Sequence, residues 1–214
     1  HGDGLAVAPA DEVRPDGRPD FESLTGEFEV DHPELYFGEG VKNWYAIVGT
    51  ERAQQNGATF DADTGIAMNS IWRKGALALT QGELDPLVSD YVTDDSQLLY
   101  RRDINERLHT MAPFLKFGSD PYPVVADGRI TWVIDGYTTS DTYPNSQFAN
   151  TAGLAPDSDL TQGRFNYLRA SVKATVDAYD GTVTLYRTER QGGDDPILDA
   201  WSRVYPGAFT PISE

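Results

Sequence analysis

Residues 120–146 read DPYPVVADGRITWVIDGYTTSDTYPNS, and this stretch decides the fold. Two runs rich in β-branched and aromatic residues, 124–126 and 129–134, flank an Asp-Gly pair at 127–128. Asp-Gly suits the two-residue type I′ turn, in which both central residues have positive φ. The stretch therefore predicts a β-hairpin, followed by a polar and aromatic loop over residues 135–144.

A second stretch has the same turn chemistry. Residues 172–179 alternate between apolar and polar side chains, and an Asp-Gly pair at 180–181 separates them from the run 182–186. Strands in this register would place Tyr179 and Tyr186 as a cross-strand aromatic pair. Two such hairpins predict an antiparallel sheet with one buried face and one wetter face.

Four stretches have helical patterns. Residues 69–80, 84–92 and 98–115 carry apolar residues at helical spacing, and Asp195 followed by Pro196 is typical of a helix start. We therefore predict an α+β fold, in which an antiparallel sheet is built on the two Asp-Gly hairpins and about three helices pack on one face.

Length and composition limit the protein class. A chain of 214 residues fits a single domain, in which residues 1–65 would form an irregular or strand-rich extension. The formal net charge of −17 repels nucleic acid and anionic lipid, so we expect no nucleic-acid partner. The absence of cysteine excludes disulfides and thiol chemistry. Since no run of about 18 apolar residues occurs, we expect no direct membrane insertion by this segment.

The loop after the first hairpin holds the densest polar cluster. Candidate ligand-binding residues there are Asp135, Tyr137, Thr138, Thr139, Asp141 and Tyr143. A purely structural role is the alternative, in which the aspartates cap turns and the threonines continue the strand. Calcium is the one cofactor considered, although the spacing matches no known calcium loop. Its oxygen ligands would come from Asp135, Thr138, Asp141 and Asn145.

An enzyme is the less favoured class. A hydrolase with paired carboxylates needs one acid of raised pKa and one ionised partner. The candidates for such a pair are Asp135, Asp141, Asp177 and Asp180. Motifs of serine hydrolases, zinc proteases, phosphate-binding loops and Rossmann folds are absent. We therefore predict no catalytic residue and favour a non-catalytic binding or structural role, with a calcium-responsive domain and a carboxylate hydrolase as alternatives.

Four long motifs resemble a known family. They are RRDINERLHTMAPFL (101–115), DPYPVVADGRITWVIDGYTTSDTYPNSQ (120–147), FNYLRASVKATVDAYDGTVTLYR (165–187) and DPILDAWSRVYPG (195–207). By these motifs the chain is similar to uncharacterised protein family 0182, whose members are large bacterial multi-pass membrane proteins. The resemblance implies a segment of their extracytoplasmic region, partnered by the rest of the same protein or by a cell-envelope component. It implies no established activity.

Overall fold

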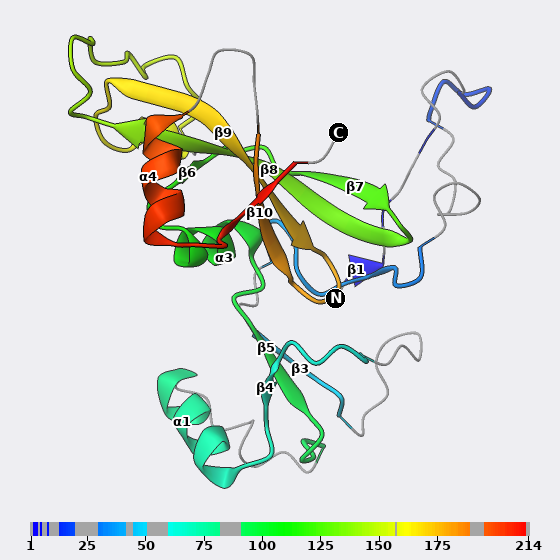
Figure 1. The fold of residues 1–214 in the computed structure, drawn as a ribbon. Coiled ribbons are helices and arrows are strands. Elements are labelled where there is room, and N and C mark those ends of the chain that lie inside the picture. Colours follow the sequence, from blue (N-terminus) through cyan, green and yellow to red (C-terminus); the bar gives the residue numbers. More distant parts are fainter. Residues whose placement is uncertain are drawn as a thin grey trace. The chain divides into compact units, whose positions relative to one another are not determined.

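The fold is α+β, and contacts divide it into two compact units (Figure 1). The first unit comprises residues 1–39 and 104–214, and the second comprises residues 40–103. A single domain over the whole chain stays a prediction. The computed structural model describes residues 2–3, 5, 8, 13–19, 30–41, 45–50, 60–81, 91–156, 158–188 and 195–212.

A six-stranded sheet forms the centre of the first unit. Its order is β11 (Phe209–Pro211), β10 (Val183–Arg187), β9 (Tyr167–Asp177), β8 (Arg129–Ser140) and β6 (Lys116–Phe117), with β7 (Tyr122–Ala126) also paired to β8. The pairs are antiparallel except for the parallel pair β10–β11. Figure 1 shows the β8–β9 pair running through the unit, with the β7–β8 turn at one end and a long loop at the other.

The first hairpin has a two-residue turn. Ala126 pairs with Arg129, which leaves Asp127 (φ 51°) and Gly128 (φ 71°) as the turn residues. These positive φ values are those of a type I′ turn. However, β8 continues to Ser140, because residues 135–140 pair with β9. The prediction that the loop begins at residue 135 is therefore wrong, and the loop begins after Ser140.

The second hairpin differs from the prediction. β9 ends at Asp177, so five residues rather than two connect it to β10. Tyr179 therefore lies in the loop, where its ring stacks on His32 with 4.2 Å between the ring centroids. Tyr186 instead faces Lys173 across the ladder. The expected Tyr179–Tyr186 pair is wrong, because the hydrogen bonds of the loop remove the last two residues from the strand.

Two helices in the first unit pack against the sheet. Helix α3 (Ile104–Met111) buries Ile104 and Leu108, and helix α4 (Pro196–Val204) buries Leu198. The side chain of Asp195 caps α4 with Pro196 as the first helical residue, so the predicted helix start is confirmed. The sheet side of this core comes from alternate residues of β8 and β9: Ile130, Ile134, Val172, Ala174 and Val176.

The first unit also holds short elements. Strands β1 (Gly2–Asp3) and β2 (Glu34–Leu35) pair antiparallel, and η3 (Asp159–Thr161) is a 3-10 turn in the long loop after β8. After β2, the N–H groups of Tyr36 and Phe37 both donate to the Ala178 carbonyl. The segment that follows β2 is thereby held against the β9–β10 loop.

The second unit has a three-stranded antiparallel sheet and a helix. Strand β5 (Gln97–Tyr100) lies between β3 (Tyr45–Val48) and β4 (Ile66–Ala67), and α1 (Ile71–Gln81) follows β4. The predicted helix over 98–115 is therefore wrong in its first part. Arg101 has φ 52°, which no helix accommodates, and α3 begins only at residue 104.

One predicted helix cannot be compared with the structure, since most of residues 84–92 lies outside the described residues. Among the helices of the described ranges, none has the length and apolar character needed to cross a membrane.

Candidate functional site

The predicted site residues of β8 lie on opposite faces of the sheet. Asp135 forms an ion pair with Lys173 at 2.7 Å between oxygen and nitrogen. The side chains of Tyr137 and Thr139 point to the same face of the sheet as Asp135 and are half-buried. Thr138 points to the other face and is fully buried. The strand therefore separates Thr138 from the other three residues.

The remaining two predicted residues lie beyond the end of β8. Asp141 is exposed, and the ring of Tyr143 stacks on Tyr167 with 4.7 Å between centroids. The Asn166 side chain bonds both the N–H and the carbonyl of Tyr143, which fixes this part of the loop. The structure thus brings Tyr143 to Tyr167, the first residue of β9.

Two of the proposed calcium ligands lie in different surroundings. Thr138 faces the interior while Asp141 faces water. Within the described parts of the chain, no group of three or more His, Asp or Glu residues is placed to hold a metal ion.

Thr138 belongs to a buried network around Asp195, which is only 4% exposed. The hydroxyls of Thr138 and Ser171 each donate to Oδ2 of Asp195 at 2.5 Å. The Tyr167 hydroxyl donates to Oδ1 at 2.9 Å, and Oδ1 also accepts the N–H groups of the first turn of α4. The sequence indicated the helix cap but gave no signal for the three hydroxyl donors, which come from two strands.

The pKa of Asp195 shows that this network stabilises the ionised carboxylate. Burial favours the neutral acid, but the hydrogen bonds from Ser171, Thr138 and Tyr167 prevail and lower the pKa of Asp195. The network therefore fixes the N-terminus of α4 on the sheet, and a lowered pKa makes Asp195 a poor proton donor.

A second arrangement lies on the face of the sheet opposite α3 and α4. Residues of β7, β8, β9, β10 and their turns line a hollow of about 440 Å³, which we call the open face. Val124 and Val133 form an apolar part of the lining, and Tyr186 of β10 also contributes to it. Hydroxyl groups come from Thr131, Thr175, Thr182 and Thr184.

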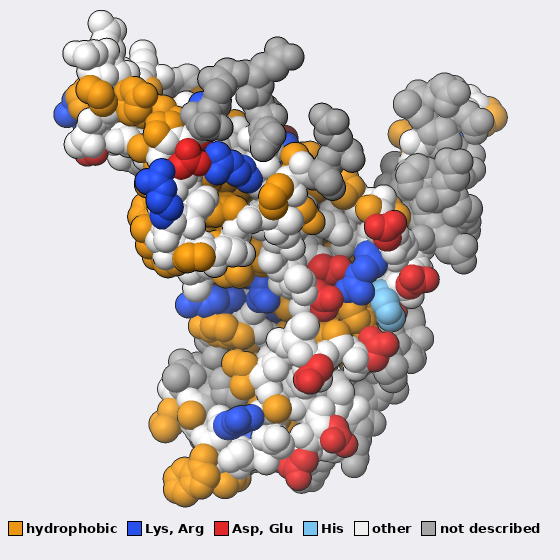
Figure 2. Space-filling view, in the orientation of Figure 1, with side chains coloured by type: hydrophobic (Ala, Val, Ile, Leu, Met, Phe, Trp, Pro, Cys, Tyr) orange, Lys and Arg blue, Asp and Glu red, His pale blue; other side chains and the backbone are white. Residues whose placement is uncertain are grey.

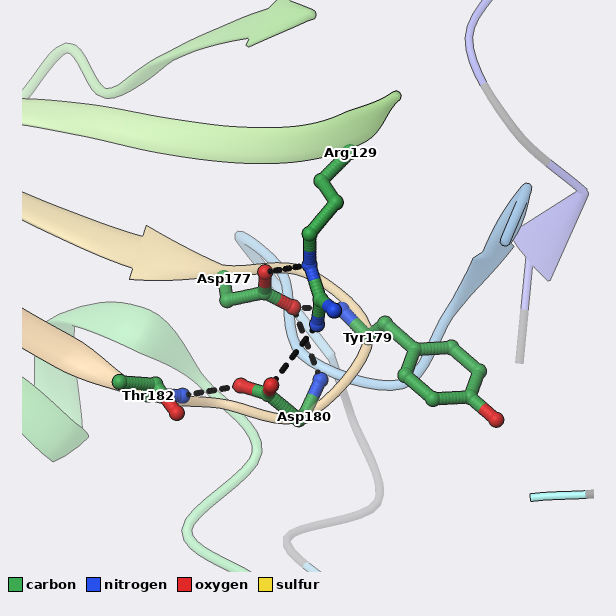
Figure 3. A network of polar contacts seen from close by, with 5 residues as sticks. All are labelled: Arg129, Asp177, Tyr179, Asp180 and Thr182. Atoms are coloured by element: carbon green, nitrogen blue, oxygen red, sulfur yellow. Dashed lines mark hydrogen bonds and ion pairs between the residues drawn. The ribbon is translucent and has the colours of Figure 1, made fainter. Parts of the chain in front are cut away.

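An ion network joins the turns at one end of the open face (Figure 3). The Arg129 guanidinium lies between Asp177, 2.6 Å from Nε, and Asp180, 2.7 Å from Nη2. Asp177 also accepts the N–H groups of Tyr179 and Asp180, and Asp180 accepts that of Thr182. Figure 3 shows both carboxylates turned toward the guanidinium, and the Arg129 Cζ also lies 6.0 Å from the centroid of the Tyr179 ring.

The charges of this network oppose acid catalysis. Burial favours the neutral acid, but hydrogen bonds from Arg129 and from two backbone N–H groups lower the pKa of Asp177. The hydrogen bond to Asp177 raises the pKa of Arg129 in turn. A hydrolase would need one carboxyl of raised pKa. The arrangement instead offers fixed charges and hydroxyls for polar contacts.

The sequence indicates some of the residues of the open face. The alternation in β9 placed Thr175 and Asp177 on the wetter face. The place of Arg129 beside Asp177 depends on the β8–β9 register, in which Thr131 pairs with Asp177. No local pattern specifies that register.

The comparisons with known proteins agree on one family. The sequence profile of the Uncharacterised protein family (UPF0182) matches residues 1–214. A UPF0182 protein of Frankia alni is 38% identical over 236 residues, which cover 99% of this chain and 22% of the relative. One from Clavibacter michiganensis subsp. michiganensis is 39% identical over 238 residues, which cover 100% of this chain and 24% of the relative.

The chain thus spans about a quarter of the length of these curated relatives. A third relative, from Micrococcus luteus, gives the same result, with 39% identity and 23% of its length covered. No solved structure matches the chain. With a profile match over its full length and bacterial relatives of this similarity, the chain belongs to the uncharacterised protein family UPF0182.

Proposed function

We propose that this chain is a non-catalytic binding module in the extracytoplasmic region of a bacterial multi-pass membrane protein, and that the open face is its binding surface. The hollow of about 440 Å³ on that face is the observation that carries the proposal. Its size lies within the range of pockets that bind small ligands.

The lining indicates the chemistry of the ligand. Threonine hydroxyls from three strands, the Tyr186 ring and the Arg129–Asp177–Asp180 charges surround the hollow. Hydroxyls and paired charges donate and accept hydrogen bonds, and an aromatic ring covers the apolar face of a ligand. A hydroxyl-rich ligand such as a cell-envelope glycan segment fits this set.

Calcium response and carboxylate hydrolysis are further proposals with less support. Asp135 is paired with Lys173, and Asp177 and Asp180 share the Arg129 guanidinium, which offsets one of their two charges. A free calcium ion would have to displace these cations, and a hydrolase would have to raise the pKa of a carboxyl group that now accepts several hydrogen bonds.

A thermal-unfolding panel tests the binding proposal. The chain is heated with soluble cell-wall glycan fragments, with calcium and with calcium plus chelator. A ligand at about 100 times its Kd adds about 2.7 kcal/mol to the free energy of unfolding, which raises Tm by several degrees. We expect a rise with glycan fragments.

Two matched variants locate the site. Tyr186→Ala removes the ring on the open face, and Tyr143→Ala removes the ring on the loop after β8. We expect the glycan-induced rise in Tm to vanish in Tyr186→Ala and to persist in Tyr143→Ala. The reverse pattern would move the site to the loop, and no rise with any fragment would reject glycan binding. A rise with calcium that chelator reverses would favour the metal-responsive alternative.

The extracytoplasmic location has its own test. A protease site inserted at Gly153 lies in the exposed loop, where no atom is within 4 Å of a Cβ built on that residue. In cells that make the full-length protein, we expect protease added outside intact spheroplasts to cut at this site. Cutting only after lysis would place the segment in the cytoplasm.

A further inference from the structure

A second hollow lies on the helix-covered side of the first unit. Its volume is about 560 Å³, and it lies between the end of α3, strand β10 and the turn from α4 to β11. Figure 2 shows hydrophobic side chains gathered over this part of the first unit. Its apolar lining comes mainly from Met111, Pro113, Phe114, Leu185, Tyr205 and Ala208. We call it the aromatic hollow.

The aromatic wall of this hollow is held in place by stacking. The Phe114 ring lies 4.4 Å from the Trp201 ring and 5.1 Å from the Tyr205 ring, and both pairs are stacked. Phe209 contacts Phe114 edge-on at 6.4 Å between centroids. The rings come from the segment after α3, from α4 and its C-cap, and from β11, and they hold one another in place. An occupant would therefore bind a preformed surface, without the entropy cost of ordering these side chains.

The lining selects an uncharged occupant. Thr110 and Thr210 contribute polar side chains beside the Tyr205 hydroxyl, and no charged residue lines the hollow among the residues that the structure describes, although the chain has a net charge of −17. Met111 is 54% exposed and Tyr205 is 46% exposed, so two large apolar side chains at the hollow lie in water. An open hollow of this kind suits a polypeptide laid across it better than a small molecule, which a site buries almost completely.

The relatives indicate where such a polypeptide comes from. They are much longer than this chain and match it over only 22% to 24% of their length. A segment of the same polypeptide is tethered to the hollow, and tethering gives an effective concentration that an independent partner lacks. Because it is uncharged, the hollow offers no electrostatic attraction to a basic protein that the acidic surface would otherwise recruit.

We propose that the aromatic hollow receives an apolar, uncharged segment from another part of the same full-length protein. The inference rests on the proposed membership of this chain in a longer polypeptide. It is independent of the open face, because none of the residues that carry the binding proposal contributes to the aromatic hollow except Thr184.

Site-specific photo-crosslinking in the full-length protein tests the inference. A benzoylphenylalanine replaces Met111, the protein is irradiated in its membrane, and the products are mapped by mass spectrometry. We expect a crosslink to a peptide outside the region that corresponds to residues 1–214. Crosslinks confined to residues 1–214, a crosslink to lipid or to a second protein, or no crosslink would each overturn the inference.

A matched pair of substitutions shows whether the hollow itself is responsible. Ala208→Glu places a carboxylate in the hollow, and Ala152→Glu places one in the exposed loop after β8. We expect Ala208→Glu to reduce the crosslink yield at least tenfold and Ala152→Glu to leave it unchanged. Equal yields in both would overturn the inference.

Thermal unfolding of the isolated chain shows whether both variants fold. Should Ala208→Glu lower Tm there, Thr210→Asp replaces it in the crosslinking experiment. The glycan panel is measured on the same isolated chain, so a failure of glycan binding and a failure of docking are observed separately.

Discussion

The Asp195 carboxylate accepts five hydrogen bonds, from β8, β9 and the first turn of α4. We expect Asp195→Ala to lower the free energy of unfolding by about 3 kcal/mol, since it removes a helix cap and leaves buried hydroxyls without an acceptor. Urea denaturation measures the loss. Asp141→Ala is the control, because Asp141 is exposed and should change stability by less than about 0.5 kcal/mol. Equal effects of the two substitutions would contradict this role.

The same carboxylate predicts a pH dependence. The folded-state pKa of Asp195 is lowered, as is that of Asp177, so the unfolded state binds protons first when the pH falls. Their contribution to stability is complete above the unfolded pKa of about 3.9 and is lost as the pH falls toward the folded values. We expect urea midpoints to drop as the pH falls from about 5 to about 3, and to drop less in Asp195→Ala. If the urea midpoints of Asp195→Ala and of the unsubstituted protein fell equally with pH, the prediction would be contradicted.

At the scale of elements, the β9–β10 loop is fixed by contacts from both sides. The Arg107 Nε donates to the Gly181 carbonyl at 2.8 Å, and the Arg107 guanidinium lies over the Phe37 ring. Gly181 has φ 74°, and a Cβ built on it would lie 2.6 Å from Cζ of Phe37. This close approach requires glycine at the position.

Gly181→Ala therefore combines two penalties. A positive φ disfavours alanine by about 1 kcal/mol, and the displaced Phe37 ring adds about 1–3 kcal/mol. Gly163→Ala is the matched control, since Gly163 has φ 88° and open space where the methyl group would lie. We expect urea denaturation to show a clearly larger loss for Gly181→Ala. Similar losses would mean that the Phe37 ring yields easily.

Elements whose pattern is local were predicted well, and those set by distant contacts were not. The Asp127–Gly128 turn and the Asp195 cap depend on neighbouring residues, and both have the expected geometry. The apolar spacing from residue 98 resembles a helix, but residues 97–100 pair with β3 and become a strand. A sequence pattern does not show that distant pairing, which outweighs helix propensity here.

The arrangement of the predicted site residues in space could not be predicted for a similar reason. Thr138 and Asp135 are three residues apart, yet an extended β8 directs them to opposite faces, whereas the predicted loop would have allowed them to converge. The length of β8 is decided by its pairing with β9, which begins 27 residues after β8 ends. The polar cluster was visible in the sequence, but its distribution in space was not.

At the scale of the molecule, residues 40–103 form an insertion within the first unit. The Ile104 N–H donates to the Gly38 carbonyl at 3.3 Å, so the first unit brings together the two ends between which the second unit is inserted. Within the second unit, the Gly40 N–H donates to the Asp103 carboxylate at 3.0 Å. Each unit thus joins its own ends.

Replacing residues 40–103 by a short Gly-Ser linker should therefore leave the first unit folded, because closing adjacent ends requires little loop entropy. We expect the amide NMR shifts of β8, β9 and α4 to match those of the intact chain. A collapsed, poorly dispersed spectrum would show that the first unit needs the insertion to fold.

The contacts of Asp195 also determine how the first unit opens. Oδ2 accepts hydroxyls from β8 and β9, while Oδ1 holds the first N–H groups of α4. Fraying of the helix from its N-terminus would also break the hydroxyl bonds to β8 and β9, so we expect the helix start and the adjoining parts of these strands to open together. The slowest-exchanging amides of α4, β8 and β9 around Asp195 should then have the same free energy of opening in hydrogen–deuterium exchange. A change that opens one of these segments would open the other two.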